Sequence, residues 1–187
     1  MLVAVSGSQG SGKSTVLQHI RDQGFNTVER KTSRSILDDW GVTLQQVNSD
    51  SVLTLKFQDE IIKRKFEDEQ QYVTSPDVWF TERTYIDLLT YSIVALGHNN
   101  DFSDWLTEYA KQCITLNQSY SMVFYLQAGH FTPKEDGVRG SNHLYSRMVD
   151  LVMQDLTQQN THPSKYVCVT SPLIEQRVHQ IITLSTK

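Results

Sequence analysis

The sequence has little cysteine, and this scarcity excludes two kinds of architecture. It contains 2 cysteines among 187 residues, Cys113 and Cys168, which lie far apart and have neither C-x-x-C spacing nor a histidine cluster beside them. A zinc site and a disulfide framework both depend on closely spaced or paired cysteines. We therefore expect neither, and we expect two buried thiols in a reducing compartment.

Long apolar runs and an excess of positive charge are also lacking. No run approaches the roughly 20 apolar residues of a membrane-spanning helix, and no basic stretch followed by an apolar segment opens the chain. The formal net charge of −4 argues against a strongly basic nucleic-acid coat, although a local basic groove stays possible. We expect a cytoplasmic protein with no membrane partner.

What the sequence does contain is an alternation of short apolar runs and helical patterns. Its length suits a single α/β domain, residues 1–187. Strands separated by amphipathic helices are typical of a doubly wound parallel sheet. The prediction is a five-stranded parallel sheet flanked by helices, with strands at 2–5, 27–29, 78–81, 122–126 and 166–169 and helices at about 51–71, 84–97, 102–117 and 172–184.

A glycine-rich segment follows the first strand and has the complete pattern G-x-x-x-x-G-K-[ST]. Its glycines allow successive backbone N–H groups to point at phosphate oxygens. Lys13 is placed to reach the terminal phosphates and Ser14 to bind Mg²⁺, while the next helix adds the positive end of its dipole. The segment predicts a P-loop NTPase domain that binds ATP and Mg²⁺ through Gly7, Ser8, Gln9, Gly10, Ser11, Gly12, Lys13, Ser14 and Thr15.

Polar residues after the second and third strands are the next candidates, because open parallel sheets bind ligands at the carboxyl ends of their strands. Glu82 follows the third strand and is expected to hold Mg²⁺ together with Ser14. Arg83 suits phosphate neutralisation. Asp87 in the same segment and Arg34 after the second strand are candidate substrate-binding residues. Glu29 ends the second strand, where it either deprotonates an acceptor hydroxyl or is an ordinary capping or ion-pairing acid.

The segment at about 128–142 lacks periodicity and contains three glycines and a proline, which predicts a mobile lid. Arg139 within it and Arg147 after it are expected to bring positive charge to the transferring phosphate. The alternative for Arg139 is a surface charge on a loop.

The long helical pattern carries two further features. Lys63-Arg64-Lys65 has acids four residues before two of its members, so we interpret it as a solvated helix face rather than a DNA-binding patch. Gln58 offers a donor and an acceptor to the edge of a pyrimidine. Phe57 either stacks on the base or, as is more common for phenylalanine, belongs to the core.

Taken together, the glycine-rich loop, Phe57-Gln58, the Glu82-Arg83-Thr84-x-x-Asp87 segment and the arginine-bearing lid resemble the thymidylate kinase and deoxynucleoside kinase group of P-loop kinases, over nearly the whole chain. In deoxynucleoside kinases a Glu after strand 2 acts as base, a Phe-Gln pair holds the nucleobase, and a Glu-Arg-Ser stretch binds Mg²⁺ and phosphates. The resemblance implies these roles for Glu29, Phe57-Gln58 and Glu82-Arg83, with Thr84 in place of Ser. Thymidylate kinases usually have Asp-Arg after strand 3 and Glu-Pro-Gly after strand 2, and this chain has neither, which weakens the case for a free monophosphate acceptor.

The segment from Gly129-His130-Phe131-Thr132-Pro133 to Asp136-Gly137-Val138-Arg139, followed by Tyr145 and Arg147, resembles small phage-encoded kinases of the same group. Some of them phosphorylate 5-hydroxymethyluracil within DNA during thymidine hypermodification. The resemblance implies such an acceptor and a protein that acts in the host-cell cytoplasm. A base within duplex DNA must flip out of the stack, and its flanking phosphates must be held by basic residues, against which the acidic balance of the chain argues. Two local groups of basic residues could do so. These residues are Arg30, Lys31, Arg34, Lys63, Arg64 and Lys65.

We therefore predict an ATP-dependent phosphotransferase with a pyrimidine acceptor. The first expectation is 5-hydroxymethyluracil in DNA, and the alternatives are a free pyrimidine deoxynucleotide and a deoxynucleoside. An alcohol acceptor must lose a proton, so Glu29 as a base favours an alcohol over a phosphate. An ATP-hydrolysing switch ranks below these because it leaves Phe57-Gln58 and the lid arginines without a purpose. The oligomeric state, monomer or homodimer, stays open.

Overall fold

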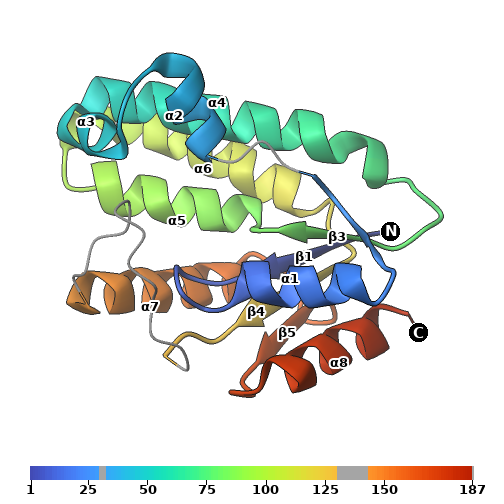
Figure 1. Ribbon diagram of the computed structural model, residues 1–187. Helices are drawn as coiled ribbons and strands as arrows, with labels where there is room; N and C mark the ends of the chain where they lie inside the picture. Colours follow the sequence, from blue (N-terminus) through green and yellow to red (C-terminus); the bar gives the residue numbers. More distant parts are fainter. Residues whose placement is uncertain (30–32, 130–142, 187) are drawn as a thin grey trace.

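The computed structural model describes residues 1–29, 33–129 and 143–186, and its centre is a five-stranded, all-parallel sheet (Figure 1). The predicted fold class is confirmed. The second strand is shorter than predicted, although the N–H of Val28 still donates to the carbonyl of Phe80 at 2.8 Å beyond its end. The strand order is β2-β3-β1-β4-β5, with β1 Leu2–Ser6, β2 Asn26–Thr27, β3 Trp79–Glu82, β4 Met122–Leu126 and β5 Tyr166–Val169.

The central strand β1 is buried along its whole length because helices cover both faces of the sheet. Its side chains alternate between two cores, as the period of a strand requires. Leu2 and Ala4 face the core built with α5 (Tyr85–Leu96) and α6 (Ser103–Asn117). Val3 and Val5 face the core built with α1 (Lys13–Asp22) and α8 (Ile174–Ser185), which lie together on the other side of the sheet (Figure 1).

Sequence signals for the helix ends are matched by hydrogen bonds. Asp50 accepts from the N–H groups of Val52 and Leu53 and caps α4 (Ser51–Glu69), which passes into the short 3-10 helix η1 (Gln70–Tyr72). Thr84 caps α5, and Gly97 follows its end. A second 3-10 turn, η2 (Asn100–Phe102), precedes α6. No helix of the described residues is long and apolar enough to cross a membrane.

Three helices lie where the sequence patterns set no bounds. Two of them, α2 (Ser33–Trp40) and α3 (Leu44–Ser49), join β2 to α4, and α3 begins with a capping box between Thr43 and Gln46. The third, α7 (His143–Gln159), packs against α5 on the same face of the sheet. The apolar residues of α2 and α3 cover the start of α4, where they form a small separate core of Ile36, Leu37, Val47 and Phe57.

Candidate active site

The glycine-rich loop leaves the centre of the sheet at Gly7, whose φ is +142°. A Cβ at Gly7 would lie 2.7 Å from the carbonyl oxygen of Leu126 and 2.7 Å from Oγ of Ser11, so a side chain cannot fit there. Gly12, with φ +92°, forms the N-cap of α1 in the left-handed region. The loop therefore curls over the N-terminus of α1, where helix dipole and free N–H groups attract anions.

Lys13 is held inside this loop. Its side chain is buried, and Nζ donates to the carbonyl oxygen of Ser8 at 2.8 Å and to Oγ of Ser11 at 3.4 Å. The ammonium group is thus fixed within the part of the loop that binds phosphates in this sequence pattern.

Ser14 and Glu82 face each other beside the loop, although they are far apart in the sequence. The parallel register pairs Val5 with Glu82, which places the acid next to the strand that leads into the loop. The hydroxyl of Ser14 donates to the two carboxylate oxygens of Glu82 at 3.1 Å and 3.3 Å. The structure therefore brings together the two residues that the sequence assigned to Mg²⁺.

The donors of this pair suit Mg²⁺, which prefers hard oxygen ligands and keeps water and phosphate oxygens in its shell. A hydroxyl and one carboxylate are too few to hold a structural metal alone. Among the residues that the structure describes, no group of three or more His, Cys, Asp or Glu side chains is placed to bind a metal ion. Ser14 and Glu82 therefore fit an ion that arrives with a nucleotide.

Asp150, on α7, connects the loop to the sheet and was missed by the sequence analysis. Oδ1 of Asp150 accepts from the hydroxyl of Ser8 at 2.6 Å and from the hydroxyl of Tyr125 at 2.7 Å. The pKa of Tyr125 is raised, mainly by burial and to a smaller extent by the neighbouring Asp150 carboxylate. The Tyr125 hydroxyl therefore stays protonated and donates its hydrogen bond. The helix that follows the predicted lid segment is thereby tied to the second residue of the phosphate-binding loop.

Arg177, on α8, supports the loop from the opposite side and was also missed. Its side chain is fully buried, and its guanidinium donates to three backbone carbonyls: Nη1 to Ser11 at 2.6 Å, Nε to Ser171 at 2.5 Å and Nη2 to Gln127 at 3.0 Å. Burial lowers its pKa from the ordinary value. The sequence does contain a signal that Arg177 has a special role. Arg177 lies on the same helix stripe as the apolar residues Ile174, Val178 and Ile181, where a charged residue is unexpected.

Arg83 and Asp87 lie on the α5 side of the same sheet edge. Arg83 is half-buried, and its guanidinium carbon lies 5.3 Å from the ring centre of Tyr91. Burial lowers the pKa of Arg83, but the effects of Tyr91, Glu82 and Asp87 outweigh it, and its pKa is raised. Asp87 is fully buried, where Oδ1 accepts from Ser6 at 2.5 Å and from Thr84 at 2.6 Å, so it braces the start of α5.

The predicted acceptor residues lie around the carboxyl edge and on α4. Glu29 is exposed and follows β2 by two residues, at the end of the strand that leads to the carboxyl edge of the sheet. Gln58 is 7% exposed, and its side-chain amide has no hydrogen-bond partner among the described residues, whereas its carbonyl accepts from Tyr109. Phe57 belongs to the α2–α3–α4 core, in edge-to-face contact with Trp40 at 6.1 Å.

The remaining predicted arginines are less closely joined to the loop. Arg147 is exposed on α7, and Arg34 is exposed on the first turn of α2. Arg139 and residues 130–142 of the predicted lid lie outside the described residues, as do Arg30 and Lys31.

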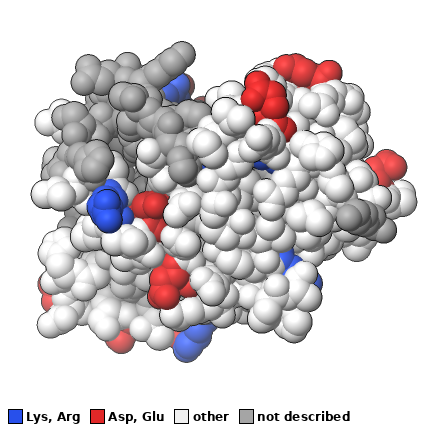
Figure 2. Space-filling model, turned by 90° about the horizontal axis from the view of Figure 1, so that it is seen from below, with Lys and Arg blue, Asp and Glu red and all other residues white. Residues whose placement is uncertain are grey.

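The interpretation of Lys63-Arg64-Lys65 as one solvated face is wrong for Lys65. Lys65 is 1% exposed, because it lies three residues after the buried Ile62 on the inner stripe of α4. Arg64 is paired with Glu60 and Asp39, both at 2.6 Å, and Lys63 is exposed. These side chains therefore do not form a single basic patch for DNA. On the face of the molecule in Figure 2, blue side chains are likewise scattered and interspersed with red ones.

Comparison with known proteins agrees with this geometry. The sequence matches the AAA domain family over residues 2–177. The structure of deoxyadenosine kinase from M. mycoides with bound dATP has a TM-score of 0.76 and 17% identity, with 100% of each chain covered. The same enzyme with products dCMP and dCDP has a TM-score of 0.74 and 17% identity, with 98% of each chain covered. The NadR protein in complex with NR has a TM-score of 0.73 and 14% identity, covering 100% of this chain and 52% of the other.

No curated protein sequence matches the chain. At these identities the structural likeness shows the fold, which is that of P-loop kinases. The predicted phosphotransferase class agrees with it, because the deoxyadenosine kinase structures match over nearly their entire length.

Proposed function

Because the chain belongs to the AAA domain family and has a kinase fold, we propose that it transfers the γ-phosphate of ATP to a hydroxyl group of a free deoxynucleoside. The observation that carries the Mg·ATP half of this proposal is the Ser14–Glu82 pair, with Oγ and Oε2 3.1 Å apart beside a glycine loop that encloses Lys13. An Mg·ATP site of this kind serves both kinases and ATPases. The acceptor side must therefore decide between them.

Two residues support a nucleoside as the acceptor. The amide of Gln58 has no partner among the described residues, so its donor and acceptor are available to the edge of a base. Glu29 follows β2 by two residues at the carboxyl edge of the sheet, where a hydroxyl acceptor requires a base. The full-length likeness to deoxyadenosine kinase supports the same class of acceptor.

The proposed reaction joins the acceptor oxygen to the γ-phosphorus and breaks the bond between that phosphorus and the bridging oxygen, which leaves with ADP. Glu29 takes the proton of the acceptor hydroxyl. Lys13 and Arg83 neutralise charge on the transferring group. Ser14 and Glu82 would hold Mg²⁺, which would add further neutralisation of the phosphate oxygens when bound.

A base within DNA is supported less well than a free nucleoside. Contacts to DNA need several accessible cations, but Lys65 is buried and Arg64 is already paired with two acids. The 5-hydroxymethyluracil acceptor expected from the sequence therefore becomes the second arm of the test.

The test is incubation with ATP labelled at the γ-phosphate and a panel of acceptors: the four deoxynucleosides, thymidylate, and DNA with and without 5-hydroxymethyluracil. We expect label in a free deoxynucleoside and none with Lys13→Ala. Label only in modified DNA would replace the proposed acceptor with the polymer. Release of inorganic phosphate at the same rate with and without every acceptor would refute the kinase and indicate an ATPase switch.

A further inference from the structure

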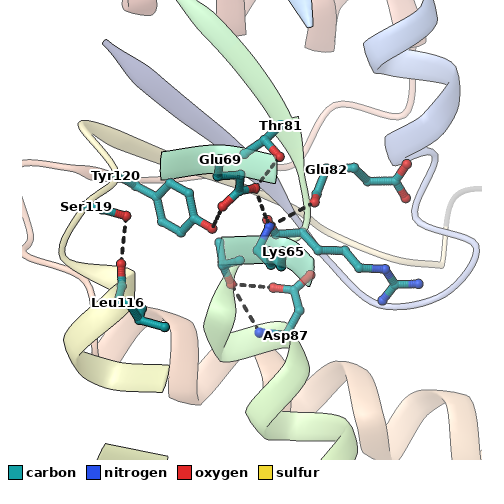
Figure 3. A network of polar contacts seen from close by, with 10 residues as sticks. Lys65, Glu69, Thr81, Glu82, Asp87, Leu116, Ser119 and Tyr120 are labelled. Carbon is teal, nitrogen blue, oxygen red and sulfur yellow. Dashed lines mark hydrogen bonds and ion pairs between the residues drawn. The ribbon is translucent and has the colours of Figure 1, made fainter. Parts of the chain in front are cut away.

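A buried ion pair lies under the carboxyl end of β3, next to the candidate active site (Figure 3). Lys65 and Glu69, one helical turn apart on α4, are each 1% exposed, and Nζ contacts Oε1 at 2.5 Å. The remaining oxygen of Glu69 accepts from the hydroxyl of Tyr120 at 2.9 Å, and Oε1 also accepts from Thr81 at 2.5 Å. The rings of Tyr85 and Tyr120 lie 5.3 Å and 5.7 Å from the ammonium group.

A contribution to folding stability does not account for a buried ion pair, because in many proteins the free-energy cost of removing two charges from water is as large as the gain from their attraction. Its other contacts show what it holds. Nζ of Lys65 also donates to the backbone carbonyls of Arg83 at 2.9 Å and Glu82 at 3.4 Å. Through Lys65, the pair therefore holds the backbone of the last residue of β3 and of the residue that follows it.

This stretch of backbone is strained. Arg83 has a φ of +68° and is the single non-glycine residue with positive φ in the described part of the chain. Such a conformation persists only where the surroundings over-determine it. Hydrogen bonds fix the backbone of Arg83 on both sides of its Cα: its N–H donates to the carbonyl of Val5 at 2.9 Å, and its carbonyl accepts from Lys65.

The strained turn decides where the neighbouring side chains point. It sends the guanidinium of Arg83 towards Tyr91 and leaves the carboxylate of Glu82 at the hydroxyl of Ser14. In Figure 3 the carboxylate of Glu82 points away from Lys65, although its backbone carbonyl points towards it. If Lys65 were removed, the turn could relax and carry the Glu82 carboxylate away from Ser14.

We propose that Lys65 and Glu69 are positioning residues, which hold the turn at Arg83 so that Glu82 receives the Mg²⁺ of Mg·ATP together with Ser14. This inference rests on the proposed function, since it assigns a supporting pair to the same nucleotide site. Neither residue touches the nucleotide. Their effect is confined to the metal-dependent part of nucleotide binding.

The test uses the double variant Lys65→Met/Glu69→Gln. Methionine replaces most of the aliphatic chain of lysine without its terminal donor, and glutamine keeps hydrogen-bonding partners for Tyr120 and Thr81. No charge is therefore left buried and unpaired. The matched control is Arg64→Met, which breaks one ion pair within α4, to Glu60, and one between α4 and α2, to Asp39, without removing a bond to β3.

Calorimetry measures ATP affinity with Mg²⁺ and with EDTA, and the ratio of the two is the metal-dependent gain. We expect about a tenfold smaller gain in the double variant, as for other residues that orient metal ligands, with affinity in EDTA unchanged and Arg64→Met equal to wild type. A folded double variant with the full gain would overturn the inference, and so would an equal loss with and without Mg²⁺. If the double variant does not fold, Lys65→Met alone decides, because it removes both bonds from Nζ to the backbone of Glu82 and Arg83. A reduced gain then supports the inference and a full gain overturns it.

The two proposals fail in different ways. Wild-type protein that binds ATP equally with Mg²⁺ and with EDTA would contradict the proposed metal site before any variant is compared. A wild-type gain that survives in the double variant contradicts only the role of Lys65 and Glu69.

Discussion

Replacement of Arg177 by methionine should destabilise the protein strongly and weaken the phosphate-binding loop. The guanidinium joins α8 to the loop at Ser11, to the end of β4 at Gln127 and to the segment after β5 at Ser171. The aliphatic chain of methionine fills much of the same space but has no donor. The substitution leaves all three carbonyls without this donor.

The size of the effect follows from these bonds. A hydrogen bond from a charged donor contributes about 1.5–3 kcal/mol, so three of them contribute up to roughly 4.5–9 kcal/mol. Methionine also escapes the desolvation cost of the buried guanidinium, which offsets part of this loss. We expect a net loss of about 3–5 kcal/mol in the free energy of unfolding, against a total of about 5–15 kcal/mol for a typical domain.

Urea unfolding followed by circular dichroism measures this loss. With a slope of about 2 kcal/mol per molar urea, the midpoint should fall by about 2 M. Arg21→Met is the matched control, because Arg21 is exposed on α1 and donates to Oγ1 of Thr27; its midpoint should shift by less than about 0.3 M. An Arg177→Met midpoint as close to wild type as that of Arg21→Met would refute the reasoning.

Two further variants test the site, and a thiol reagent tests the burial of a core residue. Glu82→Gln should raise the Mg²⁺ concentration needed for half-maximal activity about 10–100-fold, and an unchanged requirement would remove Glu82 from the metal site. Glu29→Gln should lower kcat for a hydroxyl acceptor about 10²-fold or more, whereas a wild-type rate would exclude Glu29 as the base. Burial raises the pKa of Cys113 to about 12, so about one thiol in 10⁴ is ionised at pH 8. Maleimide should therefore modify Cys113 only after the protein unfolds, and the half-buried Cys168 should react first. Early modification of Cys113 in the folded protein would contradict its burial.

Much of the fold could be predicted because its signals are local. The apolar runs of β1, β4 and β5 and the amphipathic stripe of α8 are visible in short windows of sequence. The helices α2 and α3 were not predicted, since each is short and buries its apolar residues mainly against α4. Their stability comes from that packing rather than from a strong periodicity of their own.

The donor half of the site was predictable for the same reason, and its supports were not. Gly7 to Thr15 is a contiguous motif whose backbone chemistry requires glycine at fixed positions. Asp150 and Arg177 act on that motif from the far end of the chain, through hydrogen bonds that no spacing rule predicts. Lys65 was misinterpreted because a charged residue between charged neighbours normally faces water.

By itself the sequence determined that this protein has a parallel α/β sheet, a nucleotide loop and an acid after the third strand, because each is encoded by residues adjacent in the chain. Only the tertiary structure decided which charges reach water and which are enclosed. Helix α4 turns Lys65 inward and leaves Lys63 outside, although the two are separated by one residue. The physical reason is that burial depends on the elements packed against a helix face, and these come from distant parts of the sequence.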